Sequence, residues 1–196
     1  MNVWRDRLSR WFTPLARRCP LSPNAVTLLA LAFQLIAVTC LYRRAFLLAL
    51  PFVIAGGFAD AFDGIVARAQ GKESRFGDFL DHFADRIADL ALAAGWMLGS
   101  GVREVIAMLV LIAIMLNGYI GTQIEATWKV REYDTIGRGE FVLALIVFPI
   151  VSHILFANGW QRITGAGLTI LEWMSLAMAL FAVIGIAQRF GKAKSM

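Results

Sequence analysis

Four aspartates, arranged as two pairs between residues 60 and 85, are the side chains of this sequence best suited to chemistry. Asp60 and Asp63 are three residues apart and Asp81 and Asp85 are four apart, so each pair occupies one face of a helix. A turn between the two helices brings the pairs together. Ionised carboxylates in such a cluster repel one another and are costly at membrane depth. One or two divalent cations resolve both problems, and carboxylate oxygens suit the hard ions Mg²⁺ and Mn²⁺.

The residues that lie between the two pairs favour a phosphate-bearing substrate beside the metal. Gly64 removes a side chain where a ligand approaches the backbone, and Ala67 keeps the next turn of that face shallow. Arg68 adds a cation whose guanidinium group fits phosphate oxygens. Gly77 opens the opposing wall. With the metal, these residues predict a pyrophosphate site in which charge on the transferring oxygens is stabilised.

The spacing of these residues resembles the full signature of a known family, the CDP-alcohol phosphotransferases. The signature is matched by Asp60-x-x-Asp63-Gly64-x-x-Ala67-Arg68, eight residues, Gly77, three residues, Asp81, three residues and Asp85. A second, shorter similarity is Ser22-Pro23-Asn24-Ala25-Val26-Thr27, which resembles the entry to the family's first membrane span. The resemblance covers nearly the whole chain and is most specific between residues 60 and 85.

The resemblance implies a role for each matching residue. The implied metal site is formed by Asp60, Asp63, Asp81 and Asp85. The implied CDP-binding residues are Asn24, Thr27, Gly64, Ala67, Arg68 and Gly77. Asp85 is also implied as the general base that removes the hydroxyl proton of the acceptor alcohol. In the implied reaction the acceptor oxygen attacks the β-phosphate and CMP leaves.

The acceptor alcohol is less well determined. Family members that use phosphorylated polyols such as inositol phosphate tend to carry arginines after a tyrosine in the fourth span. Here Tyr119 is followed by Gly121 and Gln123, which weakens the case for a phosphate-bearing acceptor. Cations from the loops can substitute for the missing arginines. The residues expected to bind the acceptor are therefore Lys72, Arg75, Tyr119, Gln123, Glu125, Arg131 and Arg138.

His82 leaves an alternative open. A histidine after the third aspartate resembles the choline and ethanolamine branch of the family, whose acceptor is diacylglycerol. Otherwise His82 is a polar neighbour that points away from the Asp81/Asp85 face. Asp85-Arg86 and the short chain are more similar to bacterial and archaeal phospholipid synthases. We therefore expect CDP-diacylglycerol as donor and a small polar alcohol as acceptor, with a CDP-choline or CDP-ethanolamine phosphotransferase as the alternative.

The composition places the helices that carry these residues in a membrane. Of 196 residues, 59% are hydrophobic and 17% are charged, whereas a soluble domain is about half apolar and a quarter charged. The two cysteines and two histidines have spacings that predict neither a disulfide framework nor a thiolate or histidine metal site. The net charge of +5 is not arranged as a basic stripe with interleaved aromatic residues, so no nucleic acid partner is expected.

Six apolar segments suit membrane spans, which take about 17–25 residues each. They lie at about 24–42, 46–67, 77–98, 103–128, 140–157 and 167–188. With the N-terminus inside, the cytoplasmic segments hold fourteen Lys and Arg residues against four on the other side. The positive-inside rule therefore places both termini and the active site at the cytoplasmic face of the cell membrane.

Residues 1–23 precede the first span and have a different pattern. Apolar residues recur at helical spacing while arginines supply the polar side, which predicts a helix lying in the membrane interface. The apolar residues are Trp4, Leu8, Trp11, Phe12 and Leu15. A signal peptide is disfavoured because no continuous apolar region precedes Pro20. The expected organisation is an amphipathic interfacial helix at 1–23 and an all-α, six-span membrane domain at 24–196.

A divalent-cation transporter is the alternative from a different class, because acidic residues in spans also mark ion pathways. Transporters bind their ions near the bilayer midplane. The aspartates here lie at the ends of two spans, and Arg68 would repel a permeating cation. The enzyme is therefore favoured, and the resemblance implies that it forms a homodimer.

Overall fold

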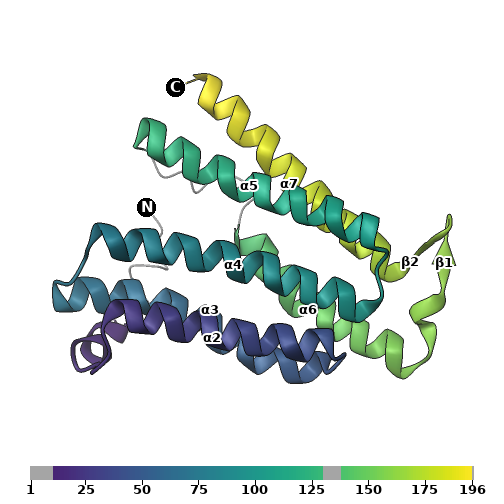
Figure 1. The fold of residues 1–196 in the computed structure, drawn as a ribbon, viewed down its shortest axis with the longest axis horizontal. Helices are drawn as coiled ribbons and strands as arrows, with labels where there is room; N and C mark the ends of the chain where they lie inside the picture. The colour runs from purple at the N-terminus through teal and green to yellow at the C-terminus, as the bar shows by residue number, and fades with distance from the viewer. Residues whose placement is uncertain (1–10, 130–137, 196) are drawn as a thin grey trace. The chain divides into compact units, whose positions relative to one another are not determined.

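The computed structural model describes residues 11–129 and 138–195, with the backbone alone for residues 138–140. Within this part of the chain the protein is helical except for one short hairpin (Figure 1). The elements are α2 (Pro23–Tyr42), α3 (Phe46–Gln70), α4 (Arg75–Ser100), α5 (Glu104–Trp128), α6 (Arg138–Ala157), η1 (Trp160–Arg162), β1 (Thr164–Gly165), β2 (Leu168–Thr169) and α7 (Ile170–Ser195). The helices α2 to α7 correspond in order to the six predicted segments.

Four of these helices are long and apolar enough to cross a membrane: α2, α3, α5 and α7. A shorter apolar stretch, Phe141–Ala157, makes up most of α6. By contrast α4 carries the second aspartate pair and several further charges, which lower its hydropathy. A membrane protein with four candidate spans is therefore confirmed, whereas the six spans stay a prediction.

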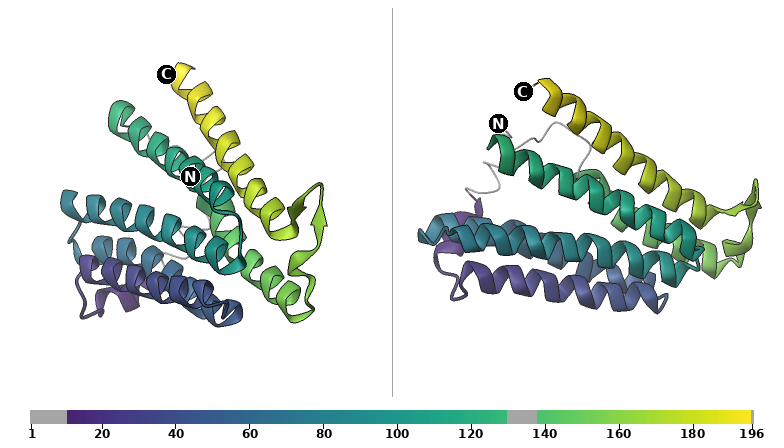
Figure 2. Two further views of the ribbon diagram at one scale, coloured as in Figure 1. Left: turned by 45° about the vertical axis from the view of Figure 1, so that its right-hand side comes forward. Right: turned by 45° about the horizontal axis from the view of Figure 1, so that its top comes forward.

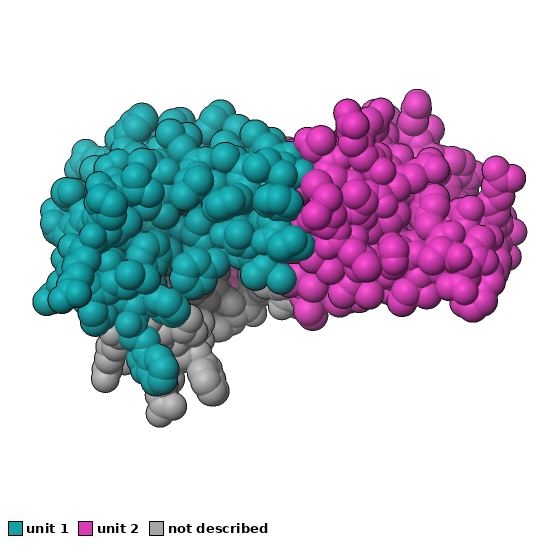
Figure 3. Space-filling view, turned by 90° about the horizontal axis from the view of Figure 1, so that it is seen from below, with its two compact units in different colours: residues 1–36, 51–88 teal, residues 37–50, 89–196 magenta. Residues whose placement is uncertain are grey.

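The chain divides into two compact units, coloured separately in Figure 3. Unit 1 comprises residues 1–36 and 51–88, and unit 2 comprises residues 37–50 and 89–196. Unit 1 holds the aspartate motif, while unit 2 holds α5, α6, α7 and the hairpin.

In unit 1, serines cap the two helices that begin beside the aspartate motif. The Ser22 Oγ accepts a hydrogen bond from the Ala25 N–H at 3.2 Å, at the start of α2. The Ser74 Oγ accepts one from the Gly77 N–H at 3.0 Å, at the start of α4. Such caps satisfy backbone donors that a helix N-terminus otherwise leaves unpaired. Both helix starts are therefore local consequences of the sequence.

The turn between α3 and α4 is also determined locally. Gly71 adopts a left-handed φ of 64°, and the Lys72 N–H donates to the Ala67 carbonyl at 2.9 Å. This is the Schellman arrangement that ends many helices at a glycine. Because Ser74 caps the next helix directly afterwards, the end of α3 and the start of α4 are held close together.

A helix at residues 11–17 packs against α3 in unit 1. Ala16 forms a buried cluster with α3, and the Phe12 ring lies 5.3 Å from the Phe58 ring. The Gln70 amide donates to the Ala16 carbonyl at 3.1 Å and to the Cys19 carbonyl at 2.9 Å. The neighbouring Trp11 is 85% exposed, as expected if it meets lipid. Residues 1–10, including Trp4 and Leu8, lie outside the described residues, and the interfacial location of this helix stays a prediction.

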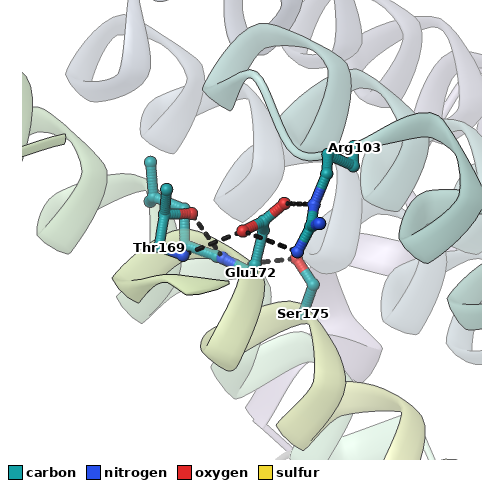
Figure 4. Close-up of polar contacts among 5 residues, drawn as sticks. Arg103, Thr169, Glu172 and Ser175 are labelled. Atoms are coloured by element: carbon teal, nitrogen blue, oxygen red, sulfur yellow. Dashed lines mark hydrogen bonds and ion pairs between the residues drawn. The ribbon is translucent and has the colours of Figure 1, made fainter. Parts of the chain in front are cut away.

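In unit 2, α5 and α7 lie side by side and run in the same direction (Figure 2). Near their N-terminal ends the Arg103 Nε donates to the buried Glu172 carboxylate at 2.5 Å (Figure 4). Glu172 also accepts from the Thr169 N–H at 2.8 Å, while the Thr169 Oγ1 accepts from the Glu172 N–H at 3.2 Å. This reciprocal pair is a capping box that starts α7.

Two glycines in α4 allow close packing against α2 within unit 2. A Cβ on Gly95 would lie 3.0 Å from the Val38 carbonyl oxygen, and one on Gly99 would lie 2.1 Å from that of Leu41. Glycines four residues apart are typical of close helix contacts in membranes. The Arg44 Nε donates to the Gly99 carbonyl at 2.8 Å. This hydrogen bond ties the turn after α2 to the end of α4.

The hairpin corrects the predicted start of the last span. Thr164 pairs with Thr169 and Gly165 with Leu168, and the two residues between them have φ values of 52° and 76°. Two consecutive positive φ values suit a two-residue type I′ turn. The predicted segment began at residue 167, but α7 begins at Ile170 because the strand and the capping box occupy the preceding residues.

Candidate active site

A cleft in unit 1 is formed by the start of α2, the end of α3 and the start of α4. Its lining residues are Pro23, Asn24, Thr27, Asp63, Gly64, Ala67, Arg68, Lys72, Glu73, Ser74, Gly77, Asp78 and Asp81. All six residues predicted to bind CDP are among them, together with two of the four predicted metal ligands.

Asp63 is held by a buried hydrogen bond. The Thr27 Oγ1 lies 2.5 Å from the Asp63 Oδ2 and 3.2 Å from the Pro23 carbonyl oxygen. A hydroxyl has one proton, and the shorter contact to a carboxylate is the stronger. Thr27 therefore donates to Asp63, which is only 7% exposed. Asp63 and Asp81 line the same cleft, so one member of each aspartate pair lies there.

Asp85 lies close to Asp81 and His82 on α4. Asp81, His82 and Asp85 each offer a ligand atom, and these atoms lie within 4.8 Å of one another. Asp85 is buried, whereas Asp81 and His82 are half-buried. The expectation that His82 would point away from the Asp81/Asp85 face was wrong. His82 precedes Asp85 by three residues, and that helical spacing was the signal for their proximity.

The donor atoms of this cluster fit a divalent cation. Carboxylate oxygens from Asp63, Asp81 and Asp85 suit Mg²⁺ or Mn²⁺, and the histidine nitrogen is a donor more typical of transition metals. Several carboxylates in a partly buried cluster also need a compensating positive charge. The residues present therefore agree with the predicted metal site.

Other lining residues of the cleft suit phosphate groups. The Arg68 side chain folds back over Gly64, so that a Cβ there would lie 3.4 Å from the Arg68 Nη1. A Cβ on Gly77 would lie 3.1 Å from the Ser74 Oγ and 3.3 Å from the Asn24 Oδ1. The N-termini of α2 and α4 both border the cleft, and helix N-termini favour anions. The cleft thus combines carboxylates that suit a cation with groups that favour an anion.

The residues predicted to bind the acceptor are distributed over both units. Lys72 lines the cleft just described, and Arg75 is exposed at the first residue of α4. Tyr119 and Gln123 are exposed on α5, and Glu125 on the same helix is half-buried. Arg131 and the side chain of Arg138 lie outside the described residues. The acceptor role of all seven residues stays a prediction.

Arg189 of α7 was not predicted as a site residue, yet it reaches α5 where an arginine was expected. Its Nη1 donates to the Asn117 carbonyl at 2.7 Å and to the Asn117 Oδ1. Its Cζ lies 3.6 Å from the position that a Cβ on Gly121 would take. No local pattern could have identified this contact, because the partners are far apart in sequence and on separate helices.

Comparison with known proteins agrees with the motif. A family model for CDP-alcohol phosphatidyltransferase matches residues 20–185. An archaetidylinositol phosphate synthase of Pyrococcus horikoshii is 37% identical over 135 residues, which is 68% of this chain and 72% of that protein. A phosphatidylinositol phosphate synthase of Mycobacterium tuberculosis is 30% identical over 195 residues, which is 94% of this chain and 86% of that protein.

Solved structures of that Mycobacterium tuberculosis synthase have a similar fold. The structure with CDP-DAG bound matches with a TM-score of 0.71 and 25% identity, covering 93% of this chain and 92% of that one. The structure in complex with manganese and citrate matches with a TM-score of 0.70 and 25% identity, covering 91% and 87%.

Proposed function

The chain belongs to the CDP-alcohol phosphatidyltransferase family, and on that premise we propose that it transfers the phosphatidyl group of CDP-diacylglycerol to a small polar alcohol, with release of CMP. The observation that carries the proposal is the cleft of unit 1. Its lining combines carboxylates of the kind that bind metal ions with Arg68, Gly64 and two helix N-termini. A nucleotide pyrophosphate needs both, because its charge must be neutralised while one phosphate is transferred.

The donor is proposed to lie with its pyrophosphate beside Arg68. The guanidinium group folded over Gly64 donates hydrogen bonds to phosphate oxygens, and Asn24 and Gly77 border the remainder of the diphosphate. The relative solved with CDP-DAG bound supports this choice of donor. Thr27 lines the same cleft, and we propose that its hydroxyl also orients Asp63.

The reaction is a substitution at the β-phosphate. The acceptor oxygen forms a bond to this phosphorus, and the bond between the phosphorus and the oxygen that bridges to CMP breaks. Asp85 takes the hydroxyl proton of the acceptor, and Arg68 stabilises the charge that moves onto CMP. The lipid phosphate thereby becomes a phosphodiester with the acceptor.

The enzyme is proposed to hold Mg²⁺ or Mn²⁺ at Asp60, Asp63, Asp81 and Asp85, with one or two ions. When bound, the cation would act as a Lewis acid and neutralise negative charge on the phosphate oxygens. The manganese complex of the solved relative supports a divalent ion. His82 extends the donor set, which favours Mn²⁺ over Mg²⁺ in this chain.

A phosphorylated polyol is the acceptor that we favour within the class of polar alcohols. Relatives named as inositol phosphate lipid synthases support it. Within unit 2, Arg189 lies beside Gly121, one of the positions at which such relatives tend to carry an arginine. Diacylglycerol as acceptor for a CDP-choline-type donor is the remaining candidate, motivated by the position of His82.

The proposed topology has six spans with both termini and the cleft on the cytoplasmic side. Support comes from the fourteen-to-four distribution of Lys and Arg residues. The helices α4 and α6 would then cross the membrane as well as the four longer apolar helices. We also propose that the protein forms a homodimer with an interfacial helix at residues 1–23, as the family resemblance implies. Cysteine labelling from each side of the membrane tests the topology.

The decisive experiment measures CMP release by the purified protein with Mn²⁺ and a panel of substrates. CDP-diacylglycerol is offered with inositol phosphate, inositol, glycerol phosphate and serine, and CDP-choline is offered with diacylglycerol. Release of CMP only from CDP-diacylglycerol, with inositol phosphate as the best acceptor, is the expected result. Turnover of CDP-choline with diacylglycerol alone would contradict the proposal and would support the His82 alternative.

A further inference from the structure

The hairpin between α6 and α7 has one polar and one apolar face. Successive side chains of an extended strand point to opposite faces, and cross-strand partners share a face. Thr164 pairs with Thr169, which places both threonines on one face. Gly165 pairs with Leu168 on the other face. Ile163, directly before β1, also has an extended backbone, with φ −64° and ψ 124°, so its side chain lies on the same face as Leu168.

Large apolar side chains on and beside the hairpin are exposed. Ile163 is 52% exposed, and Trp160, in the 3-10 helix η1 before it, is 50% exposed. Trp173, in the first turn of α7, is 49% exposed, although its Nε1 donates to the Gly165 carbonyl at 3.0 Å. That hydrogen bond satisfies the only polar group of the indole and leaves a ring of carbon atoms to meet its surroundings. We refer to Trp160, Ile163 and Trp173 as the hairpin apolar group.

The neighbouring helices place this group at a membrane boundary. The helix α7 begins at Ile170, immediately after β2, and is long and apolar enough to cross a membrane. The apolar stretch of α6 ends at Ala157, three residues before Trp160. The hairpin lies past the end of α6 and beside the start of α7 (Figure 1, Figure 2). A chain that leaves one span and enters the next passes the edge of the hydrocarbon, where tryptophan is enriched.

The length of α6 favours lipid over water as the neighbour of this group. Its apolar stretch runs from Phe141 to Ala157, and at about 1.5 Å for each residue it covers about 26 Å. The hydrocarbon core of a bilayer is about 30 Å thick. If α6 crosses the membrane as proposed, its apolar stretch is therefore about 4 Å too short. Exposed apolar side chains just past its end supply the missing depth.

We propose that η1 and the hairpin form a membrane-interface element, in which the hairpin apolar group inserts into the lipid boundary and the two threonines face water. The partner is the lipid bilayer. A hairpin with two residues in each strand is marginal by itself in water, so it needs such support. Because Trp173 ties the hairpin to α7, insertion fixes the depth at which α7 enters the bilayer. The inference rests on the proposed crossing by α6 and is independent of the proposed reaction.

Spin labels test which medium each face of the hairpin meets. Cys19 and Cys40 are first replaced by serine, and Ile163→Cys or Thr164→Cys is then labelled with a nitroxide in vesicles of phosphatidylcholine and phosphatidylglycerol. The label at position 163 should be relaxed more by oxygen, which concentrates in lipid, than by a water-soluble nickel chelate. The matched control at position 164, on the polar face, should show the reverse order.

Two outcomes of this measurement would overturn the proposal. Equal access of the nickel chelate to both positions would show that the hairpin projects into water. Exclusion of both reagents from position 163 would show that protein, such as a second copy of the chain, covers the apolar face.

Bilayer thickness gives an independent test. Unfolding temperatures are measured in phosphatidylcholine vesicles of increasing acyl-chain length. Combining Trp160→Ser with Ile163→Ser should shift the chain length of greatest stability to shorter chains, because the end of α6 loses about 4 Å of apolar cover. Thr164→Ser should leave it unchanged, and an unchanged optimum in the double variant would refute the proposal. Neither measurement involves CMP release, so failure here leaves the proposed reaction in place, and failure of that reaction leaves the interface element in place.

Discussion

Replacing Thr27 by valine is expected to weaken metal binding, because the Thr27 hydroxyl donates to Asp63 at 2.5 Å in a buried environment. Valine has nearly the same shape and removes only the hydroxyl. A hydrogen bond to a charged group contributes about 1.5–3 kcal/mol. At 1.36 kcal/mol for each factor of ten, its loss corresponds to about a 10- to 150-fold effect. Residues that orient metal ligands show losses of about 10–100-fold, which agrees with this range.

The assay is CMP release as a function of Mn²⁺ concentration at saturating CDP-diacylglycerol. Thr27→Val should raise the Mn²⁺ concentration for half-maximal activity about 10- to 100-fold, because Asp63 loses the donor that fixes its orientation. Thr27→Ser retains the hydroxyl and should stay within about threefold of wild type. Unfolding temperatures of both variants check that α2 and α3 still pack.

Two results would contradict this reasoning. An unchanged metal dependence in Thr27→Val would show that Asp63 does not need the hydrogen bond in order to bind the ion. A raised KM for CDP-diacylglycerol with unchanged metal dependence would instead indicate that Thr27 serves CDP binding alone, as the family resemblance implies.

Three further predictions concern the cleft and the helix contacts. Asp81→Asn, or EDTA added to wild type, should lower kcat by at least about 10²-fold, because the metal site loses a ligand or the ion; full CMP release in either case would exclude the assigned site. Gly77→Val should raise the donor KM, since a Cβ there already approaches the Ser74 and Asn24 oxygens to 3.1 and 3.3 Å; CDP-dependent thermal stabilisation equal to wild type would disprove it. Gly99→Ala should lower the unfolding temperature, because its Cβ would meet the Leu41 carbonyl oxygen at 2.1 Å, whereas Gly57→Ala, with nothing within 4 Å, is the control.

The helices and the two aspartate pairs could be predicted from the sequence because each depends on neighbouring residues. An apolar run of sufficient length predicts a helix, and Ser22, Ser74 and Gly71 determine where helices begin and end. The spacing within each pair places its carboxylates on one helix face. The family signature between residues 60 and 85 supplied the metal-binding and CDP-binding roles, since its spacing carries chemical information that composition lacks.

The hairpin before α7 could not be separated from the last apolar segment by hydropathy. Leu168 and Ile170 extend the apolar run, whereas the turn depends on positive φ at Ala166 and Gly167. Glycine adopts positive φ readily but alanine rarely does, so the residue types at these two positions give only a weak turn signal. Hydropathy alone therefore placed the start of the span three residues too early.

The contacts between helices were decided only by the tertiary structure. The hydrogen bond between Thr27 and Asp63 depends on which faces of α2 and α3 meet. The hydrogen bond from Arg189 to Asn117 depends on the packing of α7 against α5. A helical pattern specifies which residues share a face of their own helix, but it does not specify which residue of another helix opposes them. The chain by itself therefore determined the chemical groups of the site and their order. The structure decided which side chains hold those groups in place, because that depends on packing between segments distant in sequence.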